Sequence, residues 1–200
     1  MNYRLASFFL VIVVLFLAVL LFVAPKPSNS IIVDGIVLAG RENPGSELIA
    51  LSEAKTFIVS PAFYENHSIN PYTANAMNLF IVVLNGNDRN AVQLIRVFNP
   101  DKTLKYCATN FGNELTQENL SSTECLGFIS SSVDAVKVFI EFPDSAREMA
   151  RVEVSGDTVT IRAKSFNDVG KTGFVVLRVM FENAEEILRK TNLLVEKLLV

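Results

Sequence analysis

The sequence predicts an α+β protein with a single N-terminal transmembrane helix, followed by one mostly antiparallel sheet domain that is covered by helices and ends in two C-terminal helices. Three observations predict this fold class. The first 24 residues hold a long uncharged apolar run, the chain beyond residue 31 alternates between short β-branched runs and helical runs, and the hydrophobic period becomes helical near residue 165. Removing the first 30 residues leaves about 170, which fits one hydrophobic core of ordinary size.

The apolar run from Leu5 to Ala24 reads LASFFLVIVVLFLAVLLFVA and contains no charge, proline or glycine. At about 1.5 Å per residue it would form a helix of about 30 Å, enough to cross the hydrocarbon core of a bilayer. The alternative is a cleavable signal peptide, whose apolar region is shorter and whose cleavage site needs small residues. Phe22 and Pro25 stand at that junction, so we favour a retained transmembrane helix with the lipid bilayer as its partner.

Charge and cysteine content predict the orientation of this helix. Arg4 and the terminal amine precede it, which favours a cytoplasmic N-terminus. The cysteine pair and the Asn-X-Ser triplets at Asn66 and Asn119 favour an outside location for the domain. The predicted organisation is a short cytoplasmic N-terminus (1–4), a transmembrane helix (5–24), a spacer (25–30) and an extracytoplasmic α+β domain (31–200).

The domain begins with strand-like runs. Ile31 to Ala39 is β-branched and interrupted by Gly35, which predicts either one strand with a bulge or two short strands. After the turn RENPGS, a brief helix can run from Ser46 to Ala54. Residues 56–60 then form a strand that Pro61 ends.

The middle of the chain contains one ambiguous run. Residues 74–84 begin with ANAMN, which favours a helix, and continue with LFIVVL, which favours a buried strand; we favour a helix that ends near Gly86. Residues 91–98 are apolar on both faces, as expected of a central strand. Asn99-Pro100-Asp101-Lys102 then forms a tight turn, and residues 103–109 return as the partner strand.

The two cysteines suggest a structural disulfide. Ser121 and Glu124 have capping-box spacing, which predicts a short helix that carries Cys125. A disulfide to Cys107 would close a loop of about 19 residues and contribute about 3 kcal/mol by the chain-entropy estimate. A redox-active or metal-binding pair is the alternative, but it lacks CxxC spacing and a third ligand.

The last third of the chain has clearer patterns. Residues 136–142 predict a strand that Pro143 ends. Residues 151–154 and 158–164 alternate between apolar and polar around Ser155-Gly156-Asp157, which predicts a hairpin with a three-residue turn.

Two helices complete the domain. Asn167 or Asp168 can cap the first, which runs through Phe181, and Asn183 with the glutamate three residues later can cap the second, from Ala184 almost to the terminus. The apolar stripe of the last helix fits docking on its own sheet. The alternative is contact with another membrane or surface protein, or with a second copy, through apolar side chains off that stripe.

Several kinds of chemistry are excluded or disfavoured. His67 is the only histidine, so two-histidine catalytic or metal sites cannot form, and no nucleotide-binding or nucleophile-elbow motif is present. The net charge of -3 disfavours nucleic acid as a partner. We therefore expect no catalytic, cofactor-binding or metal-binding residues and nominate the aromatic loop at residues 63–72, with Tyr64, His67 and Tyr72, as a contact site.

Three function classes fit these patterns. We favour a membrane-tethered extracytoplasmic binding or assembly module without enzymatic activity. The second class is a surface-filament subunit: Arg4 to Ala24 resembles the N-terminal helix of type IV pilins, although the acidic residue of that family is missing from SFFLVIVV. The third class is an extracytoplasmic hydrolase that assembles its site from dispersed carboxylates.

Overall fold

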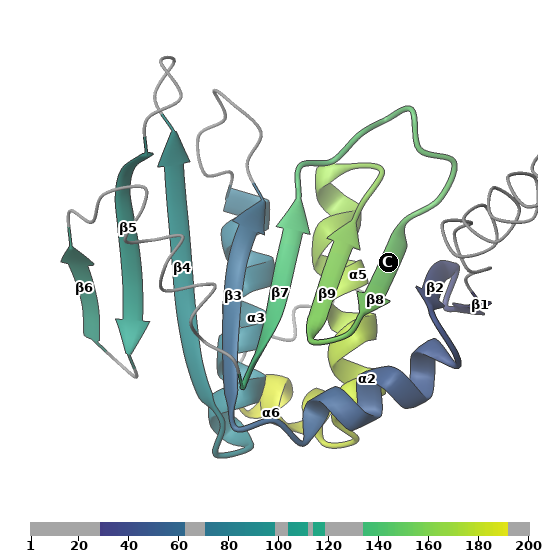
Figure 1. Ribbon diagram of the computed structural model, residues 1–200, viewed down its shortest axis with the longest axis horizontal. Helices are drawn as coiled ribbons and strands as arrows, with labels where there is room; N and C mark the ends of the chain where they lie inside the picture. The colour runs from purple at the N-terminus through teal and green to yellow at the C-terminus, as the bar shows by residue number, and fades with distance from the viewer. Residues whose placement is uncertain (1–28, 63–70, 99–103, 112–113, 119–133, 192–200) are drawn as a thin grey trace, which may run out of the picture.

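The computed structural model describes residues 29–62, 71–98, 104–111, 114–118 and 134–191. These residues form one sheet of nine strands in the order β1-β2-β8-β9-β7-β3-β4-β5-β6, together with four helices (Figure 1). The strands are β1 (Asn29–Val33), β2 (Ile36–Gly40), β3 (Thr56–Ala62), β4 (Asn90–Phe98), β5 (Leu104–Phe111), β6 (Glu114–Glu118), β7 (Ala135–Glu141), β8 (Arg151–Ser155) and β9 (Thr158–Arg162). The helices are α2 (Pro44–Ser52), α3 (Pro71–Gly86), α5 (Phe166–Met180) and α6 (Ala184–Lys190).

The predicted fold class is wrong about the sheet, which was expected to be mostly antiparallel and is mixed. Strand pairs β2–β8, β3–β4, β3–β7 and β7–β9 are parallel, whereas β1–β2, β4–β5, β5–β6 and β8–β9 are antiparallel. The error has a physical cause: α3 carries the chain back from the end of β3 to the start of β4, and such a crossover makes neighbouring strands parallel.

The predicted transmembrane helix and single-pass location are also corrected. The four helices have 9, 16, 15 and 7 residues, and none in the part of the chain that the structure describes is long and apolar enough to cross a membrane. Residues 5–24, where that helix was expected, lie outside the described residues. No described helix therefore supports a cytoplasmic N-terminus with an outside domain. Strand β1 begins at Asn29, inside the segment expected to be a spacer.

The helices cover one face of the sheet, and every second side chain of the central strands points toward them. In Figure 1, α3 lies behind β3 and α5 behind β9. Phe57 and Val59 of β3 and Val138 and Ile140 of β7 point toward the helices and belong to the core cluster. Helices α3 and α5 approach closely at Gly173, where an added Cβ would lie 3.3 Å from the ring of Phe80.

Most predicted elements are confirmed, with shifted ends. Residues 31–39 contain two strands joined by Asp34 and Gly35, whose φ values of 51° and 78° form a tight hairpin turn. The ambiguous run at 74–84 is helical, and the 151–162 hairpin is present with a turn of two residues, Gly156 and Asp157, because Ser155 pairs with Thr158. Helix α2 begins earlier than expected because the Asn43 side chain accepts hydrogen bonds from the N–H groups of Gly45 and Ser46.

Two strands and two helix caps differ from the prediction. Pro61 lies within β3. The pairing of β3 with β4 ends at Val59, before Pro61, so the missing N–H of Pro61 removes no hydrogen bond between these two strands. Strand β6 was not expected. The cap of α5 is Ser165, which forms a capping box with Asp168, while Asn183 makes no side-chain capping bond to α6.

Helix α6 docks on its own domain. Ala184 and Leu188 are fully buried in the core cluster, and Ile187 packs against Gly86, where an added Cβ would lie 2.8 Å from Ile187 Cγ2. These contacts agree with the intramolecular interpretation of the terminal helix. Residues 192–200, which would extend it, lie outside the described residues.

Candidate functional site

The carboxyl ends of the parallel strands form the candidate site. Strands β3, β7 and β9 end at the same edge of the sheet, because all three run parallel to one another. From this edge the chain returns from β3 through α3 to β4 on one side, and from β7 to the β8–β9 hairpin on the other side (Figure 1). A point where successive connections leave in opposite directions is where open sheets commonly bind ligands.

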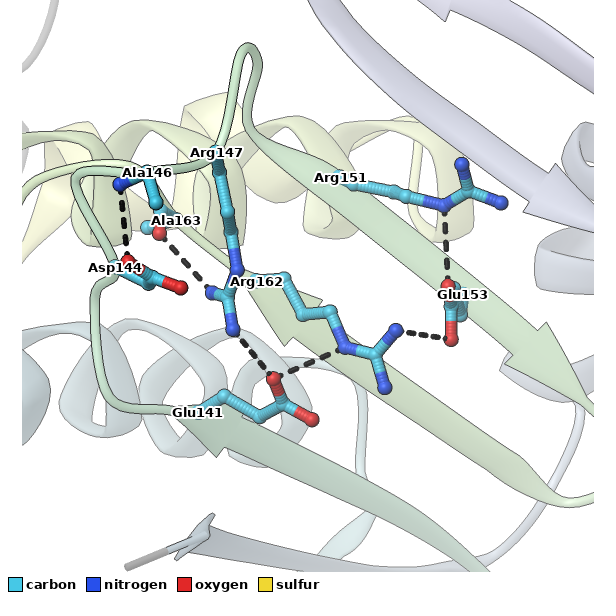
Figure 2. A network of polar contacts seen from close by, with 8 residues as sticks. All are labelled: Glu141, Asp144, Ala146, Arg147, Arg151, Glu153, Arg162 and Ala163. Carbon is cyan, nitrogen blue, oxygen red and sulfur yellow. Dashed lines mark hydrogen bonds and ion pairs between the residues drawn. The ribbon is translucent and has the colours of Figure 1, made fainter.

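Glu141, the last residue of β7, is the central polar side chain at this edge. It stands opposite Ala62 of β3, and its side chain is only 9% exposed. Val138 and Ile140 point toward the helices, so Glu141 lies on the other face of the sheet. Its Oε2 atom accepts from Arg147 Nη2 at 2.8 Å and pairs with Arg162 Nε at 3.0 Å (Figure 2). Two guanidinium groups therefore neutralise a carboxylate that solvent barely reaches.

The charged cluster continues onto the β8–β9 hairpin. Arg151 and Arg162 are direct partners across the two strands. The residues next to them, Val152 and Ile161, point into the core, so both arginines lie on the opposite face of the sheet. Glu153 separates the two guanidinium groups: its Oε2 atom is 2.7 Å from Arg162 Nη1, and its Oε1 atom is 3.1 Å from Arg151 Nε. The second contact is an ion pair without hydrogen-bond geometry. We call Glu141, Arg147, Arg151, Glu153 and Arg162 the edge cluster; its formal charge is about +1 with all groups ionised.

The loop from β7 to β8 is fastened to the end of β9. Arg147 donates from Nη1 to the carbonyl oxygen of Ala163 at 3.1 Å, and the N–H of Asp144 donates to the same oxygen at 3.2 Å. Asp144 Oδ1 in turn accepts from the N–H of Ala146 at 2.9 Å (Figure 2). The loop thus holds Arg147 against Glu141. The edge cluster is assembled from strands β7, β8 and β9 and from this loop.

Three aromatic rings lie at the same edge, where α3 and α5 begin. The ring centroids of Phe142 and Phe166 are 5.0 Å apart at nearly right angles, and those of Tyr72 and Phe166 are 5.9 Å apart. These are ordinary distances for favourable aromatic pairs. Tyr72 is 48% exposed although it is large and aromatic, so part of its ring is available for contact.

Among the residues nominated from sequence, Tyr72 is the one that the structure places at this edge. Tyr64 and His67 lie outside the described residues, in the segment that directly follows β3. Cys107 belongs to β5, and Cys125 lies outside the described residues, so the disulfide stays a prediction. Tyr72 therefore lies at the same end of the sheet as the edge cluster.

The arginines and glutamates of the edge cluster were missed from sequence. One signal was available in the alternation of the hairpin, because a register that pairs Val152 with Ile161 and Val154 with Val159 sets Arg151 opposite Arg162. Like charges directly opposite each other destabilise a strand pair, so a carboxylate had to lie nearby. Glu153 is two residues from Arg151 and satisfies that requirement, whereas Glu141 comes from a strand whose position the local pattern does not specify.

Two other ion pairs of the described residues lie outside the edge cluster. Lys137 donates to Asp157 at 2.7 Å where β7 begins, and this hydrogen bond lowers the pKa of Asp157 from its ordinary value. Lys190 likewise lowers the pKa of Glu186 on α6. Within the described ranges, no three His, Cys, Asp or Glu side chains lie close enough together to hold a metal ion.

Comparison with known proteins adds no relative: no protein-family model, no curated protein and no solved structure matches this chain.

Proposed function

We propose that this domain is a non-enzymatic binding module that holds an acidic segment of a partner protein at the carboxyl edge of β3, β7 and β9. The observation that carries the proposal is the edge cluster, in which three arginines face two glutamates on the face of the sheet opposite the helices. Arginine suits this role because its planar guanidinium can bind a carboxylate through two parallel hydrogen bonds.

Arg151 is the side chain best placed to receive a partner. It is 41% exposed and touches Glu153 through Nε, so its terminal nitrogens project beyond the cluster (Figure 2). Arg147 and Arg162, by contrast, are held by Glu141. In this proposal the inner arginines fix the position of the carboxylates, and Arg151 supplies the donors for the ligand.

Tyr72 is a second candidate contact at this end of the sheet, on the helix side, at the start of α3. Tyrosine combines a large apolar ring with a polar hydroxyl and is enriched where proteins contact one another. The hydrolase alternative gains no support here, because both glutamates of the edge cluster are already paired with arginines.

Binding of a labelled acidic peptide tests the proposal. A fluorescein-labelled peptide of ten glutamates is titrated with the full chain and followed by anisotropy, with a decalysine peptide as the charge control. Because the protein carries a net charge of -3, general attraction does not favour the acidic peptide, so binding reports on a local site. We expect Arg151→Gln to weaken binding about tenfold, the effect of losing one charge-assisted contact.

The matched control is Arg189→Gln, which removes an exposed, glutamate-paired arginine from α6, outside the edge cluster, and should leave binding unchanged. Equal affinities for the two variants would show that the edge cluster does not bind the peptide. Failure of the wild-type protein to bind the acidic peptide more tightly than the basic one would refute the proposal directly.

A further inference from the structure

The two outer strands of the sheet, β1 and β6, differ in how their unpaired sides are protected against pairing with another chain. A terminal strand leaves backbone donors and acceptors on one side, and proteins usually guard such an edge with charged residues, proline or bulges. At one end of the sheet, β6 has the sequence ELTQE, with a glutamate at each end. At the other end, β1 has the sequence NSIIV, with no charge and no proline. Among the residues that the structure describes, β1 is therefore the outer strand without such protection.

The side chains around β1 are unusually apolar for a protein surface. Ile32 is 67% exposed, the highest value among the large apolar side chains in the described residues, and it points to the face opposite the helices. Ile31 points to the helix face and lies beside Gly45 at the start of α2. Ile49, one turn further along α2, is also exposed. Isoleucine is therefore exposed on both faces of this edge.

The hairpin register shows which backbone groups face outward. Val33 and Ile36 close a two-residue turn and so exchange hydrogen bonds with each other, as does every second pair along the hairpin. Ile31 therefore bonds to Leu38 of β2. Ser30 and Ile32, the intervening residues, direct their N–H and C=O groups away from β2 toward the free edge.

We propose that two copies of this chain pair through antiparallel β1 strands, with the two-fold axis at Ile31. In this register Ser30 of each copy exchanges hydrogen bonds with Ile32 of the other, and the two Ile31 side chains meet directly across the axis. Asn29 stands opposite Val33, so no like charges oppose each other. Asp34, just beyond the strand, is already paired with Arg178.

A second copy fits this edge better than an open chain of copies does. Pairing β1 with β6 of another molecule would be head-to-tail and would propagate into a filament, and the two glutamates of β6 oppose burial beside the isoleucines. Pairing of β1 with β1 buries uncharged residues against uncharged residues and closes after two copies. The product is a continuous sheet across the two-fold axis.

Cross-linking tests the register. Residues directly opposite each other in a non-hydrogen-bonded antiparallel pair have Cα atoms about 4.5 Å apart, which a disulfide can bridge. We expect Ile31→Cys in the full chain to form a 31–31 disulfide between copies under mild oxidation, located by peptide mapping. Ile32→Cys, whose counterpart is two residues out of register, should not link to itself. Equal cross-linking of the two variants, or none by Ile31→Cys, would overturn the proposed pairing.

Sedimentation velocity of the uncross-linked protein tests the association itself. The wild-type chain should sediment as a dimer that dissociates on dilution, and Ile32→Lys should weaken association at least tenfold by placing a charge on each side of the axis. Met149→Lys is the matched control, because Met149 is also an exposed apolar residue but lies on the β7–β8 loop. Ser30→Pro is a second disrupting variant, because it removes an outward N–H without touching the β1–β2 ladder. A wild-type monomer at all concentrations, or a dimer indifferent to both β1 variants, would overturn the inference.

Discussion

Replacing Glu141 by glutamine should destabilise the domain by removing the charge that two arginines share. Glu141 Oε2 contacts Arg147 at 2.8 Å and Arg162 at 3.0 Å, and its side chain is only 9% exposed. Breaking a buried ion pair on one side costs about 3–5 kcal/mol. Here the arginines are partly exposed, with side-chain accessibilities of 23% and 34%, so solvent compensates part of the loss. We expect a loss of about 2–3 kcal/mol in the free energy of unfolding.

Urea unfolding followed by far-ultraviolet circular dichroism measures this loss. With a typical slope of about 2 kcal/mol per molar urea, the midpoint should fall by about 1–1.5 M. Glu185→Gln is the control, because Glu185 is paired with Arg189 on an exposed helix face, and its midpoint should not move measurably. The double variant Glu141→Gln/Arg147→Gln should be less destabilised than the sum of its single changes. Coincident unfolding curves for the Glu141 and Glu185 variants would refute the stabilising role of this carboxylate.

Two further perturbations test the packing and the pH dependence. Gly86→Ala should cost about 1–3 kcal/mol in urea unfolding, because the added Cβ would lie 2.8 Å from Ile187 Cγ2 and displace α6; an unchanged midpoint would mean that the two helices are not in close contact. The hydrogen bond from Lys137 lowers the folded-state pKa of Asp157 below its ordinary value of 3.8, so its contribution to stability is present above that value and is lost as the pH falls through the lowered pKa. Asp157→Asn should therefore flatten the decline in stability as the pH falls below the ordinary carboxyl value of 3.8, and an identical pH profile in the variant would argue against the ion pair.

Local patterns predicted the local elements of this fold. The β8–β9 hairpin was predicted from alternation around Gly156 and Asp157, and α5 from the change of period that follows it. These elements are specified by residues close in sequence, so a single sequence contains enough information to find them. The ambiguous run at 74–84 was resolved as a helix, and it is now clear why it carries so many apolar residues: α3 packs against both the sheet and α5.

Non-local pairing could not be predicted in the same way. Nothing near Thr56 specifies that β3 will pair with β7, whose first partner residue is Ala135, and nothing near β9 specifies that it will lie between β8 and β7. The edge cluster depends on both events, because Glu141 comes from β7 and Arg162 from β9. Its members were therefore recognisable as charged surface residues but not as one site.

The strand order also determines the timing of assembly on the ribosome. Strand β3 has β4 on one flank and β7 on the other, and β7 is synthesised about 80 residues after β3. Ribosomes typically add about 5–20 residues per second, so one side of β3, the apolar strand TFIVSPA, stays unpaired for about 4–16 s until β7 is made. The nascent chain thus carries an open strand in the middle of its future sheet for seconds. The N-terminal half of this domain should consequently depend more on chaperone shielding than the β7–α5 half, which can fold as soon as it emerges.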